Sequence, residues 1–372
     1  MSSELQMIVD VTSRIFEDHQ TEERHVDAWD AELWNLLETT GLSGVASLDT
    51  HDDGAGRLRE CAAILRVAGR FAVSVPLAEH YLSTWLLSKF GLPVPSGPLT
   101  FAVSSGLDVR RSGEVWRVSG TISRVPWAGI ARCIVVIGRS EEDEVLMTIF
   151  PPDRGVVVGH NVAGEPRDDV VIDIKLGANR VAKLKPGTTR AIQLRSALYK
   201  VALIAGATER AFELSLNYVG ERIQFGRAIG SFQVVQHQIA EMAGEVLALR
   251  TACDAAVECC ITESPLRWPM LLAVASAKSQ AGRSATVIAR TSHQLHGAIG
   301  FTYEHSLRMS TTRLWAWRDE CGSETYWANE VGSHLLGTED ELWAALVGAD
   351  SGDLRVREDI CENVEAGVQH GN

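Results

Sequence analysis

The sequence lacks several features that would place it in other classes of protein. No apolar run approaches the roughly 20 residues that a membrane-spanning helix needs. Basic residues are in the minority, with 35 Lys and Arg against 48 Asp and Glu and a net charge of −13, which argues against nucleic acid or an anionic membrane as the main partner. No basic leader precedes an apolar stretch, so we expect no secretory signal and a cytoplasmic protein.

Motifs for metals and for the common nucleotide folds are also missing. The seven cysteines are scattered and odd in number, which is typical of reduced, packed thiols. His293, His296 and His305 do not have a convincing metal spacing, so we predict no metal site. No nucleophile elbow, Walker loop or Rossmann glycine fingerprint stands in a suitable context. A nucleotide site would therefore have to be built from helix ends and loops.

The patterns that are present predict a mainly helical protein with a central β domain. At 372 residues with 45% hydrophobic residues, the chain has room for two or three domains. The chain begins with apolar residues at helical spacing, continues with short β-branched runs and ends with longer helical segments. No long helical crossovers separate the β-branched runs, so their strands should pair mostly antiparallel. We expect an N-terminal helical domain (1–98), a small antiparallel β domain (99–187), a C-terminal four-helix bundle (188–345) and a polar acidic tail (346–372).

One turn between two predicted long helices carries unusual chemistry for an acidic chain. The stretch GERIQFGRAIGSFQ places Arg222 and Arg227 beside glycines. A guanidinium can bind a phosphate through two hydrogen bonds, and the N–H groups that open the next helix favour the same charge. The alternative is that both arginines cap helix ends or pair with surface carboxylates such as Glu221.

A second stretch, QLHGAIGFTYEH, follows another predicted helix. Gln294 and His296 offer polar groups there, and Gly297 and Gly300 allow the backbone to approach a ligand closely. The alternative is a glycine-rich connection between two helices.

These two stretches together resemble the C-terminal helical domain of acyl-CoA dehydrogenases. GEVWRVSGTISRVPWAGIARCIVVIG resembles the β domain of that family, and LRVAGRFAVSVPLAEHYLSTWLLSKFG its N-terminal helical domain. The resemblance covers roughly residues 10–340. It implies FAD-dependent desaturation of an acyl-CoA thioester between Cα and Cβ, with a glutamate as base and an electron-transferring flavoprotein as electron acceptor.

The resemblance also implies roles for particular residues. Arg222, Phe225 and Gln233 match positions that touch the FAD diphosphate and adenosine of a neighbouring subunit. Gln294 and Gly297 match the loop on the other side of that ADP moiety.

Three departures from the family pattern concern the flavin ring and the base. The flavin-facing stretch of the β domain is shortened, and Pro126 stands near the usual threonine. One family position for the base falls near Ser196 and the other near Cys321 or Gly322, none of which is a carboxylate. Glu320 is the nearest acid and Glu324 the second; the alternative for each is a solvated carboxylate in a polar loop.

Such departures resemble the short subunits of heteromeric α2β2 acyl-CoA dehydrogenases of actinobacterial sterol degradation. That resemblance implies a longer homologous partner that supplies the base, and a bulky steroid-derived CoA substrate. Two other readings stay open: a self-sufficient homotetramer that uses Glu320, and a non-catalytic acyl-CoA-binding or scaffold subunit.

Overall fold

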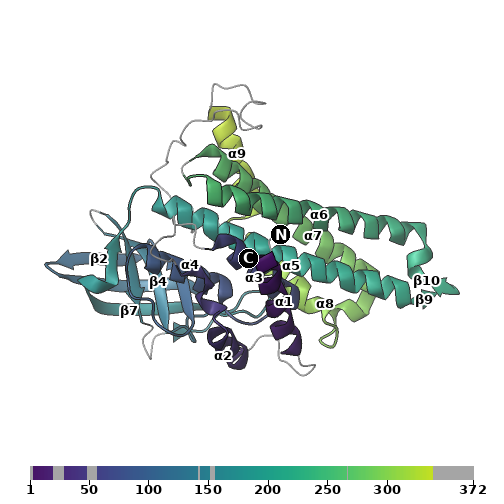
Figure 1. The fold of residues 1–372 in the computed structure, drawn as a ribbon, viewed down its shortest axis with the longest axis horizontal. Coiled ribbons are helices and arrows are strands. Elements are labelled where there is room, and N and C mark those ends of the chain that lie inside the picture. Colours follow the sequence, from purple (N-terminus) through teal and green to yellow (C-terminus); the bar gives the residue numbers. More distant parts are fainter. Residues whose placement is uncertain are drawn as a thin grey trace.

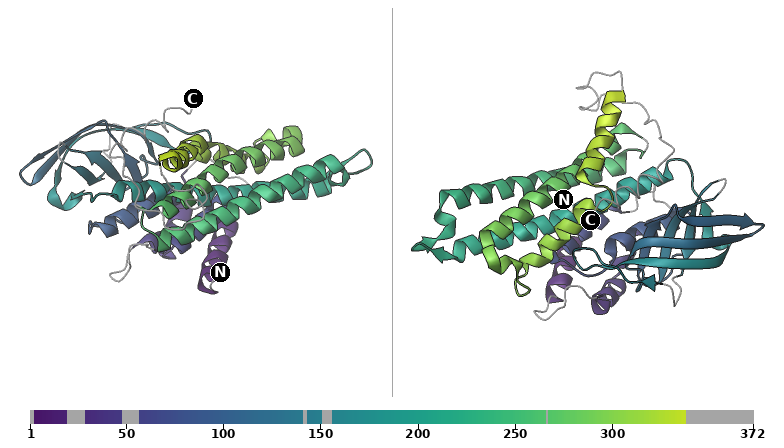
Figure 2. Two further views of the ribbon diagram at one scale, coloured as in Figure 1. Left: turned by 90° about the horizontal axis from the view of Figure 1, so that it is seen from above. Right: turned by 180° about the vertical axis from the view of Figure 1, so that it is seen from behind.

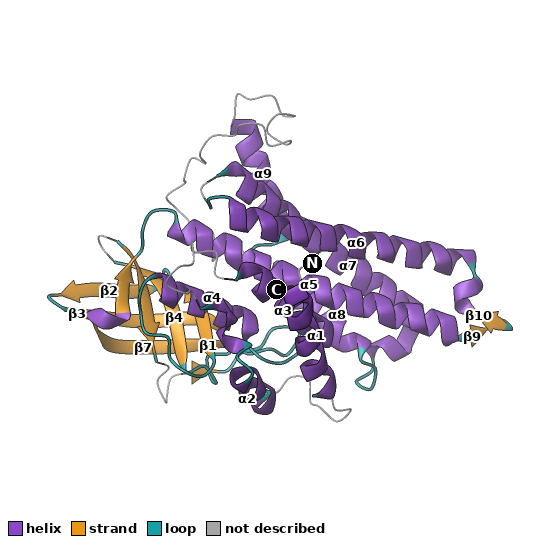
Figure 3. Cartoon of the chain, viewed as in Figure 1, coloured by secondary structure: helices purple, strands orange, loops and turns teal. Residues whose placement is uncertain are grey.

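Helices predominate, and the strands of two four-stranded sheets gather at one end of the molecule (Figures 1 and 3). The computed structural model describes residues 3–19, 29–47, 57–140, 143–150, 156–265 and 267–337. The predicted fold class, mainly α with a central β domain, is confirmed by this arrangement. The tail predicted for residues 346–372 lies outside the described residues.

The N-terminal helices pack against the long helix α5 and against the β strands. The amphipathic helix α3 buries Ile64, Leu65 and Ala68, whereas α4 is buried on nearly all sides. Asp30 caps α2 by accepting a hydrogen bond of 3.0 Å from the backbone N–H of Leu33. The elements are α1 (Ser3–Asp18), α2 (Ala31–Thr39), η1 (Ser43–Ala46), α3 (Leu58–Phe71) and α4 (Leu77–Lys89).

The β region is a two-layer sandwich with its own core. One sheet has the order β1-β4-β5-β8 and the other β2-β3-β7-β6, and Ile134, Met147, Val118 and Ile172 meet between them. All pairings are antiparallel except β1 with β4. The strands are β1 (Leu99–Val103), β2 (Leu107–Ser112), β3 (Val115–Pro126), β4 (Cys133–Arg139), β5 (Glu144–Ile149), β6 (Val156–Val157), β7 (Arg167–Gly177) and β8 (Val181–Lys183), with η2 (Ala178–Arg180) before β8.

Four helices, α5 to α8, form a bundle that extends away from the sheets in all views (Figures 1 and 2). A small hairpin, β9–β10, joins α5 to α6 at the far end of this bundle, and α9 packs on α7. The elements are α5 (Thr188–Glu221), β9 (Ile223–Gln224), β10 (Arg227–Ala228), η3 (Ile229–Ser231), α6 (Gln233–Thr262), α7 (Trp268–His296), η4 (Gly297–Phe301), α8 (Leu307–Asp319) and α9 (Glu324–Gly337).

Two glycines bring α3 and α5 into backbone contact. A Cβ at Gly69 would overlap the carbonyl oxygen of Leu203, and a Cβ at Gly206 would overlap that of Arg66. Any larger residue at either glycine would push the two helices apart. The N-terminal helices are thus tied to the middle of the bundle.

None of the helices within the described ranges combines the length and hydropathy of a membrane span.

Candidate functional site

The far end of the bundle carries the first predicted motif on an exposed hairpin. Arg222 follows the last residue of α5, and its carbonyl accepts a hydrogen bond of 2.8 Å from the backbone N–H of Ile229. Phe225 lies in the turn with φ of +53° and is 90% exposed. Gln233 is the exposed first residue of α6. The three side chains are therefore presented outward by a backbone that is itself hydrogen-bonded.

The second motif lies at the same end, because a ring contact joins the last turns of α5 and α7. Tyr218 stacks on His296 with ring centroids 4.4 Å apart. Gln294 is exposed on the last turn of α7, and Gly297 ends that helix with φ of +65°, a conformation that favours glycine. The fold thus brings together the two stretches that the sequence separates by about 70 residues.

This end has the chemistry to bind the ADP part of a dinucleotide on an open surface. Arg222 offers a charged donor, the amides of Gln233 and Gln294 offer neutral ones, and no atom lies within 4 Å of a Cβ built on Gly297. A group of exposed apolar side chains surrounds them, as expected for a surface that another subunit covers: Ile223, Phe225, Val234, Ile299, Phe301 and Tyr303.

Arg227 has a different role, because its side chain contacts the start of α6 within the same hairpin. Its guanidinium is 4.2 Å from the centre of the Phe232 ring. A stacked arginine of this kind holds the hairpin against the start of α6.

Where the bundle meets the β sandwich, Glu320 lies among charged side chains. Its Oε1 accepts a hydrogen bond of 3.0 Å from Nε of Arg167, at the start of β7, and a second from Arg167 Nη2. Its Oε2 lies 2.9 Å from Nζ of Lys200, in the middle of α5. The Glu320 side chain is 22% exposed, so it is not the solvated loop carboxylate that the polar sequence around it suggests.

Two further carboxylates complete this cluster. Glu79 Oε1 lies 3.0 Å from Lys200 Nζ, and Glu165 Oε2 lies 3.1 Å from Arg167 Nη2. Glu165 also accepts a hydrogen bond of 3.0 Å from the indole of Trp317, and its Oε1 lies 3.8 Å from Nε of the buried Arg313. We call the six charged groups the junction cluster: Arg167, Lys200, Arg313, Glu79, Glu165 and Glu320.

The junction cluster lowers the pKa of Glu320, whereas a catalytic base would need a raised pKa. Burial raises the pKa of Glu320, but the charges of Arg167 and Lys200 and their hydrogen bonds outweigh burial and hold the pKa well below its usual range. Burial lowers the pKa of Lys200, and Glu320 and Glu79 more than compensate, so Lys200 stays protonated. A base that removes an α proton needs a raised pKa, which Glu320 does not have.

The other positions considered for the base do not offer a suitable group either. Ser196 donates a hydrogen bond of 2.7 Å to the carbonyl of Ile192, one turn earlier in α5. Burial raises the pKa of the Cys321 thiol. Glu324 is exposed at the first turn of α9.

The space beside the junction cluster is too small for a flavin ring or an acyl chain. Trp127, Glu165, Lys200 and Trp317 line a cavity of about 20 Å³, which is room for about one water molecule. Trp127 directly follows Pro126, in the segment that the resemblance places against the flavin. This cavity therefore has no room for a flavin ring, whereas the exposed groups at the far end of the bundle suit the ADP part of a dinucleotide.

The junction cluster was not among the residues singled out from the sequence. Its one sequence signal is Lys200, a lysine within the apolar run ALYKVALIAG of α5. A lysine at such a position is seldom buried without a partner. The partners come from α4, β7 and α8, and no spacing within the sequence joins them.

Comparison with known proteins shows which proteins this chain is similar to. Residues 195–318 match the family model described as the acyl-CoA dehydrogenase C-terminal domain. The chain is 24% identical over 322 residues to the acyl-CoA dehydrogenase IpdE2 of Mycolicibacterium smegmatis, which covers 83% of this chain and 91% of that protein.

Two solved structures share the fold. The first is the ChsE4–ChsE5 complex from Mycobacterium tuberculosis, with a TM-score of 0.81, 22% identity and coverage of 91% of this chain and 99% of that one. The second is a variant of the Tcur3481–Tcur3483 steroid ACAD, with a TM-score of 0.78, 22% identity and coverage of 90% and 98%.

The chain thus has the fold of the acyl-CoA dehydrogenase structures that it matches, and it contains the C-terminal domain of these oxidoreductases. Over most of its length the chain is similar to acyl-CoA dehydrogenases, and residues 195–318 match the C-terminal domain of that family.

Proposed function

We propose that this chain is one subunit of a heteromeric, FAD-dependent acyl-CoA dehydrogenase that introduces an α,β double bond into an acyl-CoA thioester. A longer homologous subunit supplies the base and the cradle of the flavin ring, and the electrons pass to an electron-transferring flavoprotein. The proposal rests on the difference between two places in the chain. The groups suited to ADP, around Arg222, are exposed, whereas the cavity beside the junction cluster measures only about 20 Å³.

The contribution of this chain to the reaction is to hold the cofactor across a subunit boundary. When bound, FAD supplies the hydride acceptor of the family's reaction. Arg222 would bind a phosphate oxygen of it through charge-assisted hydrogen bonds, and the amides of Gln233 and Gln294 would fix neighbouring polar atoms. Phe225 would cover the adenine side with an aromatic face. These groups position the cofactor and take no part in proton transfer.

A bulky substrate, such as a steroid-derived CoA thioester, is supported by the known proteins that share this fold. The ChsE4–ChsE5 structure is a complex of two different subunits, and the Tcur3481–Tcur3483 protein is a steroid ACAD. Because the junction of this chain is filled by ion pairs, the acyl group would lie in the partner subunit.

Cofactor stoichiometry tests the proposal. The chain should be purified alone and after co-expression with a longer homologous subunit, and the visible flavin absorbance and the released FAD should be measured. We expect a yellow complex that holds one FAD for each pair of unlike subunits and a colourless chain when it is alone. If the chain alone binds one FAD and reduces a dye with an acyl-CoA, the heteromeric assignment is wrong.

The closed junction also favours a second function, that of a non-catalytic acyl-CoA-binding or scaffold subunit that has lost the flavin. The same measurement separates the two, because a scaffold would leave the complex with a partner colourless. The self-sufficient homotetramer with Glu320 as base is disfavoured by the ion pairs of Glu320 with Arg167 and Lys200.

A further inference from the structure

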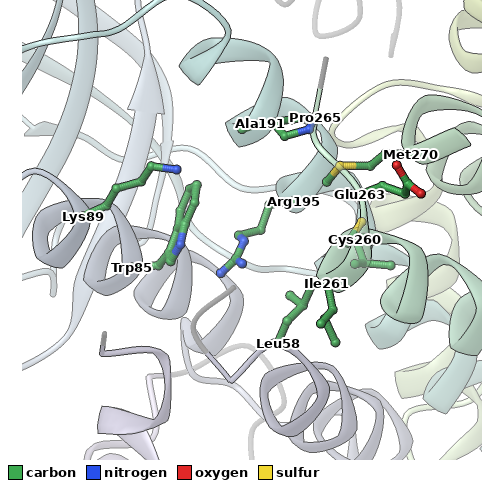
Figure 4. A pocket seen from close by; sticks show the side chains of 11 residues that line it. Leu58, Trp85, Lys89, Ala191, Arg195, Cys260, Ile261, Glu263, Pro265 and Met270 are labelled. Carbon is green, nitrogen blue, oxygen red and sulfur yellow. The ribbon is translucent and has the colours of Figure 1, made fainter. Parts of the chain in front are cut away.

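A cavity of about 160 Å³ lies among the N-terminal part of α5, the helices α3 and α4, the end of α6 and the start of α7 (Figure 4). It is separate from the sites described above. Ala191, Arg195 and Leu198 line it from α5, whereas Lys200 and Leu203 line the small junction cavity and Arg222 lies at the far end of the same helix. Nothing in the proposed function uses this cavity.

One side of this cavity is cationic. The indole of Trp85 lies between two positive side chains, with the Arg195 guanidinium carbon 4.1 Å and the Lys89 Nζ 4.9 Å from the ring centre (Figure 4). Arg195 is buried, and its guanidinium also donates a hydrogen bond of 3.4 Å to the hydroxyl of Tyr199. The ring thus fixes two like charges on the same wall.

The two cations act on one another. Burial lowers the pKa of Lys89, and the charges of Arg195 and Lys185 lower it further. An anion bound beside Arg195 and near Lys89 would offset this repulsion.

The remaining walls are mostly apolar. Leu58, Leu198, Ile261 and Met270 contribute hydrocarbon surface, and Glu263 is the one carboxylate among the lining residues. The Cys260 thiol also faces the cavity; burial raises its pKa to about 12, so it behaves as a neutral, unreactive wall. A ligand that suits these walls has an apolar body and a negative end.

We propose that this cavity binds a small amphiphilic carboxylate, such as an acyl or aromatic acid of about six carbons. Its carboxylate would lie beside the Arg195 guanidinium at the edge of the Trp85 ring, close to the Lys89 charge, and its hydrocarbon would contact Leu198, Ile261 and Met270. The size fits, because a cavity of about 150 Å³ in another protein holds benzene. The negative end distinguishes this site from a simple apolar void, which would bind the neutral analogue equally well.

Ligand binding to the purified chain, or to its complex with the partner subunit, tests the proposal. Titrations with hexanoate and with hexanamide should be followed by ligand-observed NMR and by isothermal calorimetry. We expect saturable binding of hexanoate, and binding of hexanamide at least about tenfold weaker, since a hydrogen bond to a charged group is stronger than a neutral one. Equal binding of the two, or no saturable binding of hexanoate, would overturn the assignment.

Variants locate the binding within the molecule. Lys89→Met changes an exposed residue at the rim and should weaken hexanoate binding by about tenfold, with no change for hexanamide. Arg195→Met should have at least as large an effect, but it removes a buried contact, so folding must be checked by circular dichroism. Lys183→Met, an exposed lysine on β8 that does not line the cavity, is the matched control. Unchanged binding in Lys89→Met, or equal loss in Lys183→Met, would contradict the site.

Discussion

Charged and polar side chains are exposed at the far end of the bundle and buried where the bundle meets the β sandwich. At the far end, Arg222 and the amides of Gln233 and Gln294 are exposed on a hairpin and a helix terminus. At the β-domain end, Arg167 and Lys200 are buried and bonded to Glu320. The residues suited to hold a ligand are presented to solvent, while the acid considered for catalysis is part of the internal structure.

Under the proposed function, this difference would let the chain hold one half of a cofactor while a partner subunit holds the other. The six members of the junction cluster balance, three cations against three carboxylates. A balanced, hydrogen-bonded cluster is stable in a buried place only while all its members remain. It therefore fills the space between the bundle and the β sandwich and leaves a cavity of only about 20 Å³ beside it.

The largest expected effect is on stability, from Glu320→Gln. The amide leaves Arg167 and Lys200 without their shared carboxylate, and breaking a buried ion pair typically destabilises by about 3–5 kcal/mol. Denaturant unfolding should show this loss, while Glu221→Gln, at the exposed end of α5, should change the free energy of unfolding by less than about 0.5 kcal/mol. At a temperature where the Glu320→Gln variant is folded, its complex with the partner should retain dehydrogenase activity. If the variant lost activity without losing stability, Glu320 would act as the base after all.

The same ion pairs give stability a defined pH dependence. Because the pKa of Glu320 is lowered in the folded state, its contribution is fully present above the unfolded value of about 4.3 and is lost as the pH falls toward the folded value. We expect the difference in unfolding free energy between the wild-type chain and Glu320→Gln to be constant above about pH 5.5 and to shrink steadily below about pH 4. A difference that grows in acid would contradict the ion-pair account.

The next effect concerns the cofactor and comes from Arg222→Ala in the complex. Loss of a charge-assisted hydrogen bond should weaken FAD binding by about 10- to 100-fold, with the free energy of unfolding of the chain nearly unchanged because the side chain is exposed. Equilibrium dialysis of FAD from the complex measures this. Arg227→Ala is the control and should bind FAD normally, since the Arg227 guanidinium stacks on Phe232. An equal loss of FAD in both variants would show that Arg222 does not bind the cofactor.

The smallest expected effect is that of Phe225→Gly, which separates a role of Phe225 in binding from a role in the stability of the chain. Phe225 has φ of +53°, a conformation that costs a non-glycine residue about 1–2 kcal/mol, while glycine loses about 0.5–1 kcal/mol more backbone entropy on folding. The isolated chain should therefore be equally or slightly more stable. The complex should bind FAD or its partner subunit more weakly, which size-exclusion chromatography and flavin absorbance would show. A strong loss of stability in the isolated chain would mean that Phe225 serves only its own hairpin.

The two motifs at the far end of the bundle can be recognised from the sequence because their signals are local. Arg222, Phe225 and Gln233 fall within one turn, and Gln294 with Gly297 within another, so motif and geometry coincide. The long helices also follow from their apolar periodicity, and the β strands from short β-branched runs without crossovers. What joins the two motifs is the stacking of Tyr218 on His296, which only the packing of α5 on α7 provides.

The junction could not be predicted in the same way because its contacts are long-range. Glu320 follows α8, Arg167 starts β7 and Lys200 lies within α5. From the sequence alone, Glu320 stands in a polar stretch beside Asp319 and Gly322, which is typical of solvent exposure. The tertiary fold brings the three together and reverses that expectation, from a solvated acid to an internal ion pair.

The contact of Gly69 with α5 also has a consequence for the time course of synthesis. About 140 residues separate Gly69 from Gly206, and the entire β sandwich lies between them in the chain. At ribosomal rates of about 5–20 residues per second, α3 would emerge on the order of ten seconds before the helix that it packs against. The part of its apolar face that packs on α5 stays uncovered during that interval, so a chaperone that binds the nascent N-terminal helices would protect them.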